Sequence, residues 1–158
     1  MRPIRQDDVA LEADFVRNLS DESRYKRFMA SMRELPQVKL DSLTAADQVR
    51  DVALAATVTR EGRPVIVGVA RYSVGPEHSG CEFAVAVDDA WQGTGLAGIL
   101  MHALMGIARD RGLSTIEGIV LTTNSRMLKL ARQLGFRRLP DPGSRDTVRV
   151  VRSLQSPP

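Results

Sequence analysis

The sequence predicts an α/β fold for this chain of 158 residues. Apolar residues recur at steps of three and four over residues 96–111, which is the spacing of an amphipathic helix. Short apolar runs at residues 81–87 and 115–121 precede and follow this segment, and their length favours buried strands. A strand, a helix and a second strand in succession are typical of an α/β protein.

Shorter elements are expected on both sides of this centre. Residues 1–5 should form an edge strand, because Pro3 removes a backbone donor. Asp7 or Asp8 is the expected N-cap of a helix that ends near Asn18. The other expected elements are helices over residues 23–32, 43–46 and 125–134 and β-hairpins over residues 52–73 and 136–151. We expect one domain over residues 1–152 and a frayed tail over residues 153–158.

Composition and charge argue against several classes of protein. The 22 basic and 19 acidic residues are spread along the chain and give a net charge of only +3, which does not indicate nucleic-acid binding. The longest apolar window, residues 96–108, is too short to span a bilayer, and no secretion leader is expected. One cysteine and two histidines without ligand spacing predict no metal site. A single cysteine fits a reducing compartment, so we expect a cytoplasmic protein with neither membrane nor nucleic acid as partner.

A glycine-rich loop joins the strand at residues 81–87 to the long helix. Its sequence is Gln92-Gly93-Thr94-Gly95-Leu96-Ala97-Gly98. The glycines at positions 93 and 95 allow a tight turn and leave the backbone N–H groups uncovered by side chains. The positive end of the helix dipole points at the same small volume, which suits a phosphate or pyrophosphate group. The loop is therefore predicted to hold a nucleotide or a coenzyme.

Two families of phosphate-binding loop fit this spacing. Residues 93–98 match the G-x-G-x-x-G fingerprint of dinucleotide-binding proteins, which also requires a carboxylate at the end of the next strand. That strand ends in Thr122-Thr123-Asn124 instead, and Glu117 lies inside it. The dinucleotide interpretation is therefore the weaker of the two.

Read as Gln92-x-x-Gly95-x-Ala97, the loop resembles the pyrophosphate loop of the GNAT superfamily of N-acetyltransferases. Members of that family also have an Asn on the next strand–helix turn and a Gly-Phe after that helix. This chain has Asn124 and Gly135-Phe136 at those places. The resemblance covers nearly the whole chain and is greatest to the Pat-type protein lysine acetyltransferase domains.

The resemblance implies the GNAT acyl-CoA N-acyltransferase fold, with a mixed central sheet flanked by helices. It also implies acetyl-CoA as the cosubstrate, with its phosphates on the loop and its pantetheine along the preceding strand. The residues implied in this binding are Val85, Val87, Gln92, Gly93, Thr94, Gly95, Leu96, Ala97, Gly98 and Asn124. Asn124 can equally serve only as the N-cap of the helix that follows it.

Glu82 is the candidate catalytic residue. A carboxylate is costly to bury unpaired in a strand that is otherwise Phe, Ala and Val, so a salt bridge at the strand edge is one explanation. The resemblance implies the other, a general base. Cys81 is expected in the core, because successive strand residues point to opposite faces. Many GNAT enzymes carry a Tyr general acid four residues before the Gly-Phe, where this chain has Ala131.

These observations predict an enzyme that moves an acetyl group from acetyl-CoA to a primary amine. The expected acceptor is a protein lysine, such as one on an acyl-CoA synthetase. A small-molecule amine is the alternative acceptor, and a non-catalytic acyl-CoA sensor is the alternative from another class. The resemblance implies that residues 20–32, with the stretch to residue 50, form one wall of the amine cleft. Their poor fit to any simple period, which is typical of a functional loop, supports this expectation.

Overall fold

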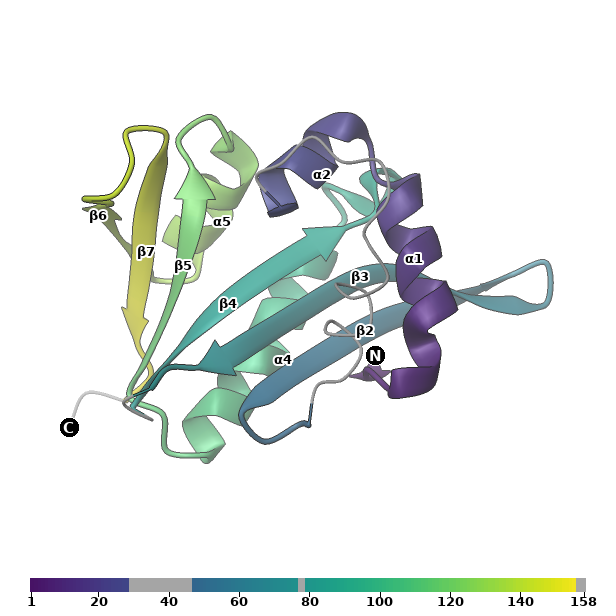
Figure 1. Ribbon diagram of the computed structural model, residues 1–158, viewed down its shortest axis with the longest axis horizontal. Coiled ribbons are helices and arrows are strands. Elements are labelled where there is room, and N and C mark those ends of the chain that lie inside the picture. The colour runs from purple at the N-terminus through teal and green to yellow at the C-terminus, as the bar shows by residue number, and fades with distance from the viewer. Residues whose placement is uncertain (29–46, 77–78, 156–158) are drawn as a thin grey trace. The chain divides into compact units, whose positions relative to one another are not determined.

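The computed structural model describes residues 1–28, 47–76 and 79–155. Its helices and strands follow one another along the chain in the order that the sequence predicted (Figure 1). In chain order they are β1 (Arg2–Pro3), η1 (Gln6–Asp8), α1 (Val9–Asn18), α2 (Asp21–Phe28), β2 (Asp51–Arg60), β3 (Arg63–Val74), β4 (Gly80–Val87), η2 (Asp89–Trp91), α4 (Leu96–Asp110), β5 (Thr115–Leu121), α5 (Ser125–Gln133), β6 (Arg137–Pro140) and β7 (Thr147–Ser153). The short helix expected at residues 43–46 lies outside the described residues.

The strands form one mixed sheet in the hydrogen-bonded order β1-β2-β3-β4-β5-β7-β6. β1 pairs antiparallel with β2 at one edge, which is where Pro3 was expected to place it. β4 and β5 are parallel, and β7 is antiparallel to both β5 and β6. The mixed sheet implied by the resemblance is therefore present.

The chain divides into two compact units, which are described separately. Unit 1 comprises Met1–Tyr72 and Ala84–Leu104, and unit 2 comprises Ser73–Phe83 and Met105–Pro158. β3, β4 and α4 each contribute residues to both units.

In unit 1, α1 and the N-terminal part of α4 lie on opposite sides of the strands (Figure 1). The core beneath α1 joins Phe15 and Val16 to Ala55 of β2 and Ile66 of β3. On the side of α4, a Cβ atom at Gly68 would lie 2.9 Å from Leu100 Cδ1, so α4 packs closely on β3. Burial of both faces explains why β2 and β3 are apolar over most of their length.

Unit 2 is built around β5 and β7, whose ladder pairs every residue of Thr115–Leu121 with one of Thr147–Ser153. Phe83 and Phe136 meet edge to face in its core, with ring centroids 5.3 Å apart. Ser153 is part of β7, and Leu154 is buried, with its N–H donating to the carbonyl of Ser114 at 2.8 Å. Ser153 and Leu154 are therefore part of the packed structure of unit 2, although the frayed tail was expected to begin at residue 153.

The first helix is capped at Asp8, one of the two expected residues, but its N-cap makes no side-chain hydrogen bond to the helix. A short 3₁₀ turn precedes α1 and includes Asp8. The Asp8 carboxylate instead accepts two hydrogen bonds from the Arg2 guanidinium, at 2.7 and 2.8 Å, and one from the N–H of Arg5. The charge-assisted pair with Arg2 is the stronger interaction, so it takes the carboxylate away from the helix end.

Candidate active site

The glycine-rich loop of unit 1 connects η2 to α4 and has the backbone that its sequence predicts. Gly93 and Gly95 have φ angles of 81° and 87°, which side chains with a Cβ rarely adopt. A Cβ atom at either position would have no heavy atom within 4 Å, so the loop is open above both glycines. The chain therefore leaves room beside the backbone for another molecule.

Backbone donors gather in this loop. Five amides in this loop and at the start of α4 donate no hydrogen bond to any described residue: those of Gly93, Gly95, Leu96, Ala97 and Gly98. The first intrahelical bond of α4 is the one from the N–H of Ile99 to the carbonyl of Gly95, at 3.1 Å. Uncommitted amides at the positive end of a helix of 15 residues form a binding site for an anion.

The carboxylates of the two aspartates before the loop accept hydrogen bonds from groups outside the loop. Asp88 caps η2 by accepting from the N–H of Ala90 at 2.9 Å. Asp89 accepts from the N–H of Ser20 at 3.1 Å and from Ser23 Oγ at 3.2 Å, both at the start of α2. Burial opposes ionisation of Asp89, but the hydrogen bonds from Ser20 and Ser23 outweigh it and lower the pKa of this carboxyl. Neither carboxylate competes with an anion for the loop amides.

Gln92 belongs to the same hydrogen-bonded cluster. Its side-chain Nε2 donates to Ser23 Oγ at 3.2 Å and to the carbonyl of Val87 at 3.5 Å. The predicted coenzyme residue Gln92 thus joins α2, the end of β4 and the loop. Val87 is buried and Val85 is half-buried.

Glu82 lies in the part of β4 that belongs to unit 2. The recorded pairs of β4 with β5 are Gly80 with Thr115, Cys81 with Ile116 and Glu82 with Glu117. The Glu82 side chain is exposed, whereas Cys81 and Phe83 on either side of it are buried. Glu82 makes no ion pair or hydrogen bond with its side chain to any described residue. The salt bridge considered from the sequence is therefore absent from the described part of the chain, and the side chain does not lie in the core.

Cys81 is a core residue, as its place next to Glu82 predicted. It is 3% exposed, and its thiol donates to the carbonyl of Thr115 at 3.7 Å. Burial, and to a lesser extent the charge of Glu117, raises the pKa of this thiol to about 12. A thiol that stays protonated at neutral pH is a poor nucleophile.

Asn124 and Ala131 lie in unit 2, the first at the N-terminus of α5 and the second inside this helix. The Asn124 side chain accepts from the N–H of Met127 at 3.2 Å, so it is the N-cap of α5. Its contact with a coenzyme stays a prediction. Ala131 is 1% exposed, so the position where many family members carry a tyrosine is filled by a core methyl group.

Sequence reasoning missed one charged pair near Glu82. Arg149 of β7 donates from Nε and Nη2 to Glu117 Oε2 on β5, at 3.2 and 2.5 Å. Each of the two side chains is about 38–39% exposed. The sequence does show one charged residue inside each of two apolar strands. Only the register of β5 and β7 shows that these two residues are neighbours.

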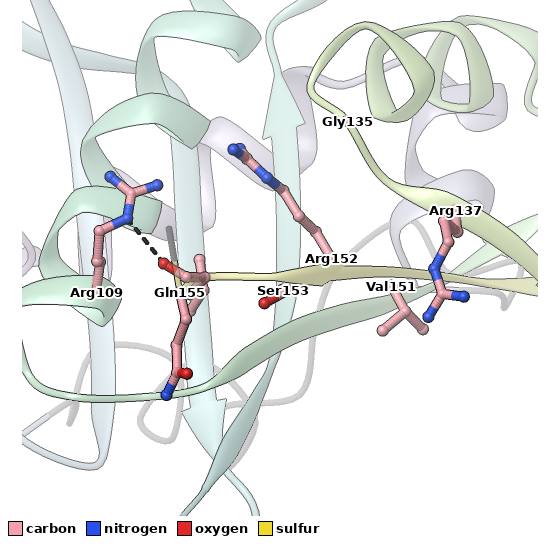
Figure 2. A pocket seen from close by; sticks show the side chains of 8 residues that line it. Arg109, Gly135, Arg137, Val151, Arg152, Ser153 and Gln155 are labelled. Atoms are coloured by element: carbon pink, nitrogen blue, oxygen red, sulfur yellow. Dashed lines mark hydrogen bonds between the residues drawn. The ribbon is translucent and has the colours of Figure 1, made fainter. Parts of the chain in front are cut away.

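Unit 2 also contains a hollow of about 470 Å³ (Figure 2). It is lined by Arg109 of α4, Gly135, Arg137 of β6 and the end of β7. The dashed line marks the hydrogen bond from Arg109 Nε to the carbonyl of Leu154, at 3.0 Å. No residue predicted to bind the coenzyme or to act in catalysis lines this hollow, so it is not the predicted site.

Comparison with known proteins decides the family. A model of the acetyltransferase (GNAT) family matches residues 14–136 of this chain. The chain belongs to the GNAT family of acetyltransferases. Its prediction as an acetyl-CoA-dependent N-acetyltransferase is confirmed at the level of the family.

Individual GNAT relatives are similar over most of the chain. Acetyltransferase PA5475 of Pseudomonas aeruginosa is 33% identical over 154 residues, which cover 98% of this chain and 82% of that protein. Acetyltransferase Pat of Mycolicibacterium smegmatis is 30% identical over 135 residues, which cover 85% of this chain and 40% of that protein. The crystal structure of the GNAT domain of S. lividans PAT has a TM-score of 0.86 at 31% identity, covering 96% of this chain and 88% of that chain. The GNAT fold and the likeness to Pat-type domains are both confirmed.

Two further features concern the described residues only. They contain no group of three or more His, Cys, Asp and Glu side chains that could hold a metal ion. None of their helices combines the length and the apolar character needed to cross a membrane.

Proposed function

We propose that this GNAT protein transfers the acetyl group of acetyl-CoA to a lysine side chain of a protein, with Glu82 as general base and residues 1–152 as one catalytic domain. The observation that carries the proposal is the row of uncommitted backbone amides at the start of α4, in a chain of the acetyltransferase family. The proposed location is the cytoplasm, which suits both the free cysteine and the cosubstrate.

The loop fits the phosphates of acetyl-CoA. The amides of Gly93 and Gly95–Gly98 supply donors, and both glycines with positive φ leave open space beside them. Gln92 and Thr94 complete the loop, and Val85 and Val87 of β4 are the proposed contacts of the pantetheine arm. Asn124 is the proposed contact from the turn before α5. When bound, acetyl-CoA supplies an activated acyl group as a thioester.

Glu82 is proposed to accept the proton of the acceptor amine. A lysine ammonium with a pKa of about 10.4 is deprotonated in roughly one molecule in a thousand near pH 7.4, a cost of about 4 kcal/mol. Glu82 takes this proton directly or through a water, and the amine lone pair then attacks the carbonyl carbon of the thioester. A C–N bond forms, the C–S bond breaks and the thiolate leaves with the sulfur electron pair. The amide nitrogen loses its second proton, so the products are the acetyl-lysine, the free thiol and one proton released to solvent.

No tyrosine is available at the position of Ala131 to protonate the leaving sulfur. A coenzyme thiolate is a fairly good leaving group at neutral pH, so its proton can come from water or from the protonated Glu82. The buried Cys81 takes no part in this scheme, since its thiol is protonated at neutral pH. Transfer is therefore direct, without an acetyl-enzyme.

The acceptor is proposed from the likeness to Pat. The similarity to Pat of Mycolicibacterium smegmatis covers 85% of this chain, and that to the GNAT domain of S. lividans PAT covers 96%. A protein lysine, such as one on an acyl-CoA synthetase, is therefore favoured over a small amine. A non-catalytic acyl-CoA sensor would keep the uncommitted backbone amides of the loop. It would not need the exposed carboxylate of Glu82, which has no partner among the described residues.

Two experiments test the proposal. Calorimetry should show binding of acetyl-CoA that Gly95→Asp weakens by at least tenfold, because a carboxylate is placed among the phosphate donors. Gly95→Ala is the matched control for backbone strain at a φ of 87°, and it should lower the folding stability by about 1–2 kcal/mol. Tight binding of NAD without binding of acetyl-CoA would overturn the assignment.

Turnover separates the acceptors. Acetylation of a purified acyl-CoA synthetase should exceed that of a panel of small amines, and Glu82→Gln should lower kcat by about 10²–10⁴-fold with acetyl-CoA affinity retained. Glu61→Gln, in the exposed turn between β2 and β3, is the matched control and should act like the wild type. Wild-type turnover by Glu82→Gln between pH 6 and 9 would remove Glu82 from the mechanism.

A further inference from the structure

Three charged side chains lie next to one another across β4, β5 and β7 of unit 2, and we call them the charged row: Glu82, Glu117 and Arg149. The parallel ladder sets Glu82 opposite Glu117. Residues opposite each other in a ladder point to the same face of a sheet, so both carboxylates leave β4 and β5 on one side. Cys81 and Phe83 point to the other side, where they are buried.

Arg149 belongs to the same face of the sheet. It pairs with Ile119 in the antiparallel ladder of β5 and β7, which places it diagonally to Glu117, two residues earlier on β5. Its Nε and Nη2 both donate to Glu117 Oε2, at 3.2 and 2.5 Å. The hydrogen bond to Glu117 and the negative charge of Glu117 raise the pKa of Arg149 above its usual value.

The geometry of this ion pair leaves part of Glu117 uncommitted. Both donors of Arg149 go to Oε2, and Oε1 accepts no hydrogen bond from any described residue. Neither oxygen of Glu82 has a partner in the same part of the chain. The charged row thus presents three unused acceptor oxygens and carries a formal charge of −1. An alkylammonium group has three N–H donors and a charge of +1.

We infer that Glu117 binds the acceptor amine together with Glu82, and that Arg149 is a positioning residue that fixes the Glu117 carboxylate for this purpose. This inference rests on the proposed function and deepens it. The lysine ammonium enters as a cation and donates to Glu117 Oε1 and to Glu82. The proton on the Glu82 side then passes to that carboxylate, which becomes neutral as the amine does. Glu117 keeps the nitrogen in place while its lone pair is freed.

The charged row also defines a substrate class. It complements an amine that is a cation at neutral pH, such as the side chain of lysine or another primary alkylamine. An arylamine is neutral at that pH and brings no charge to the row. The acceptor site should therefore favour alkylamines through its binding step.

Steady-state kinetics with a lysine peptide test the inference. Glu117→Gln should raise the KM of the peptide about two- to fivefold, as expected for one exposed charge pair, with kcat within about twofold and the KM of acetyl-CoA unchanged. Turnover of a small arylamine should be unaffected. Glu117→Asp, which keeps the charge, should recover most of the peptide affinity.

The Arg149 variants should show the opposite pattern, in which kcat falls and the peptide KM does not rise. In Arg149→Gln the freed Glu117 carboxylate competes with Glu82 for the ammonium, so kcat should fall about two- to fivefold while the peptide KM stays the same or decreases. Arg149→Lys should restore kcat, and Arg60→Gln, at the exposed end of β2, is the matched control. A merely structural ion pair would alter thermal stability without this split.

The outcomes separate this inference from the proposed function. If the wild type acetylates the peptide and Glu117→Gln has an unchanged peptide KM, the role of Glu117 is overturned and the proposed function stands. If both variants lower the apparent kcat in proportion to their loss of folded protein and leave the peptide KM unchanged, the ion pair is structural only. If the wild type binds acetyl-CoA and acetylates no amine, the proposed function falls and the inference falls with it.

Discussion

The Glu12 carboxylate of α1 and the Arg71 guanidinium of β3 form a buried ion pair, with Oε1 3.1 Å from Nη2. The two side chains are 4% and 15% exposed. Burial raises the pKa of Glu12, and the charges of Arg71 and Arg27 oppose the rise. Burial also lowers the pKa of Arg71 and, with the repulsion of Arg71, takes that of Arg27 to about 10. Each buried charge therefore depends on its partner.

Arg71→Met should destabilise the protein by about 3 kcal/mol near neutral pH, because it leaves a buried carboxylate unpaired. The folded pKa of Glu12 is raised, so the stability that this group contributes is complete below its unfolded pKa and is lost as the pH rises through the folded value. Loss of Arg71 raises that folded value further. Urea unfolding should therefore show a larger destabilisation at pH 8 than at pH 5.

The double variant Glu12→Gln with Arg71→Met is the control for this prediction. It removes the unpaired charge and should be more stable at pH 8 than Arg71→Met alone. Equal destabilisation of Arg71→Met at the two pH values would show that Glu12 is not the group left unpaired.

Asp89→Asn should loosen α2 from the turn before the coenzyme loop. The carboxylate holds Ser20 and Ser23 across a separation of 69 and 66 residues. Since Asp89 is exposed, we expect a loss of only about 1 kcal/mol at pH 7. Its pKa is lowered in the fold, so this contribution is complete above the unfolded pKa and disappears as the pH falls through the folded pKa. Thermal unfolding from pH 7 to pH 3, with Asp110→Asn as control, measures the effect; identical curves for the two variants would contradict it.

Two glycine-to-alanine changes should have opposite signs. A Cβ atom at Gly118 of β5 would lie 2.6 Å from Phe83 Cε1, whose ring packs on Phe136. Gly118→Ala should therefore destabilise unit 2 by about 1–3 kcal/mol. A Cβ atom at Gly106 of α4 would meet nothing within 4 Å, and Gly106→Ala should stabilise the helix by about 0.5–1 kcal/mol. Midpoints of thermal unfolding test both. Recovery of Gly118→Ala by Phe83→Leu would show that the ring is the obstacle.

Cys81→Ala should retain acetyl transfer with kcat within about twofold, because a thiol with a pKa of about 12 is not ionised at neutral pH. The folded wild type should resist alkylation by iodoacetamide, and urea should expose the thiol. A radiolabelled acetyl group that stays on the wild-type protein after denaturation and is absent from Cys81→Ala would contradict direct transfer.

The sequence predicted those parts of the fold that local chemistry decides. The glycines at 93 and 95 specify the loop, and the apolar period specifies α4, because both signals lie within a few residues of the structure they produce. The cap at Asn124 and the helix end before Gly135, with a φ of 88°, were predictable for the same reason.

What the sequence did not predict depends on register and on distant neighbours. Asp8 is at the N-cap position, but its carboxylate binds Arg2 instead of the N–H groups of α1. The role inferred for Glu117 depends on two strand registers. The parallel register places it opposite Glu82, and the antiparallel register places Arg149 diagonally to it. Neither register is encoded in a local motif, so both carboxylates had to be judged one at a time from the sequence.

Two roles of Asn124, capping α5 and contacting the coenzyme, can be separated by mutation. Asn124 uses Oδ1 to accept from Met127, and its Nδ2 group has no partner among the residues described. Serine and aspartate also cap helices well, but serine lacks the second donor and aspartate adds a negative charge. If position 124 were only a cap, the three residues would be interchangeable there. A preference for asparagine over both in acetyl-CoA affinity, at equal helix stability, would therefore reveal selection by the coenzyme and not by the fold.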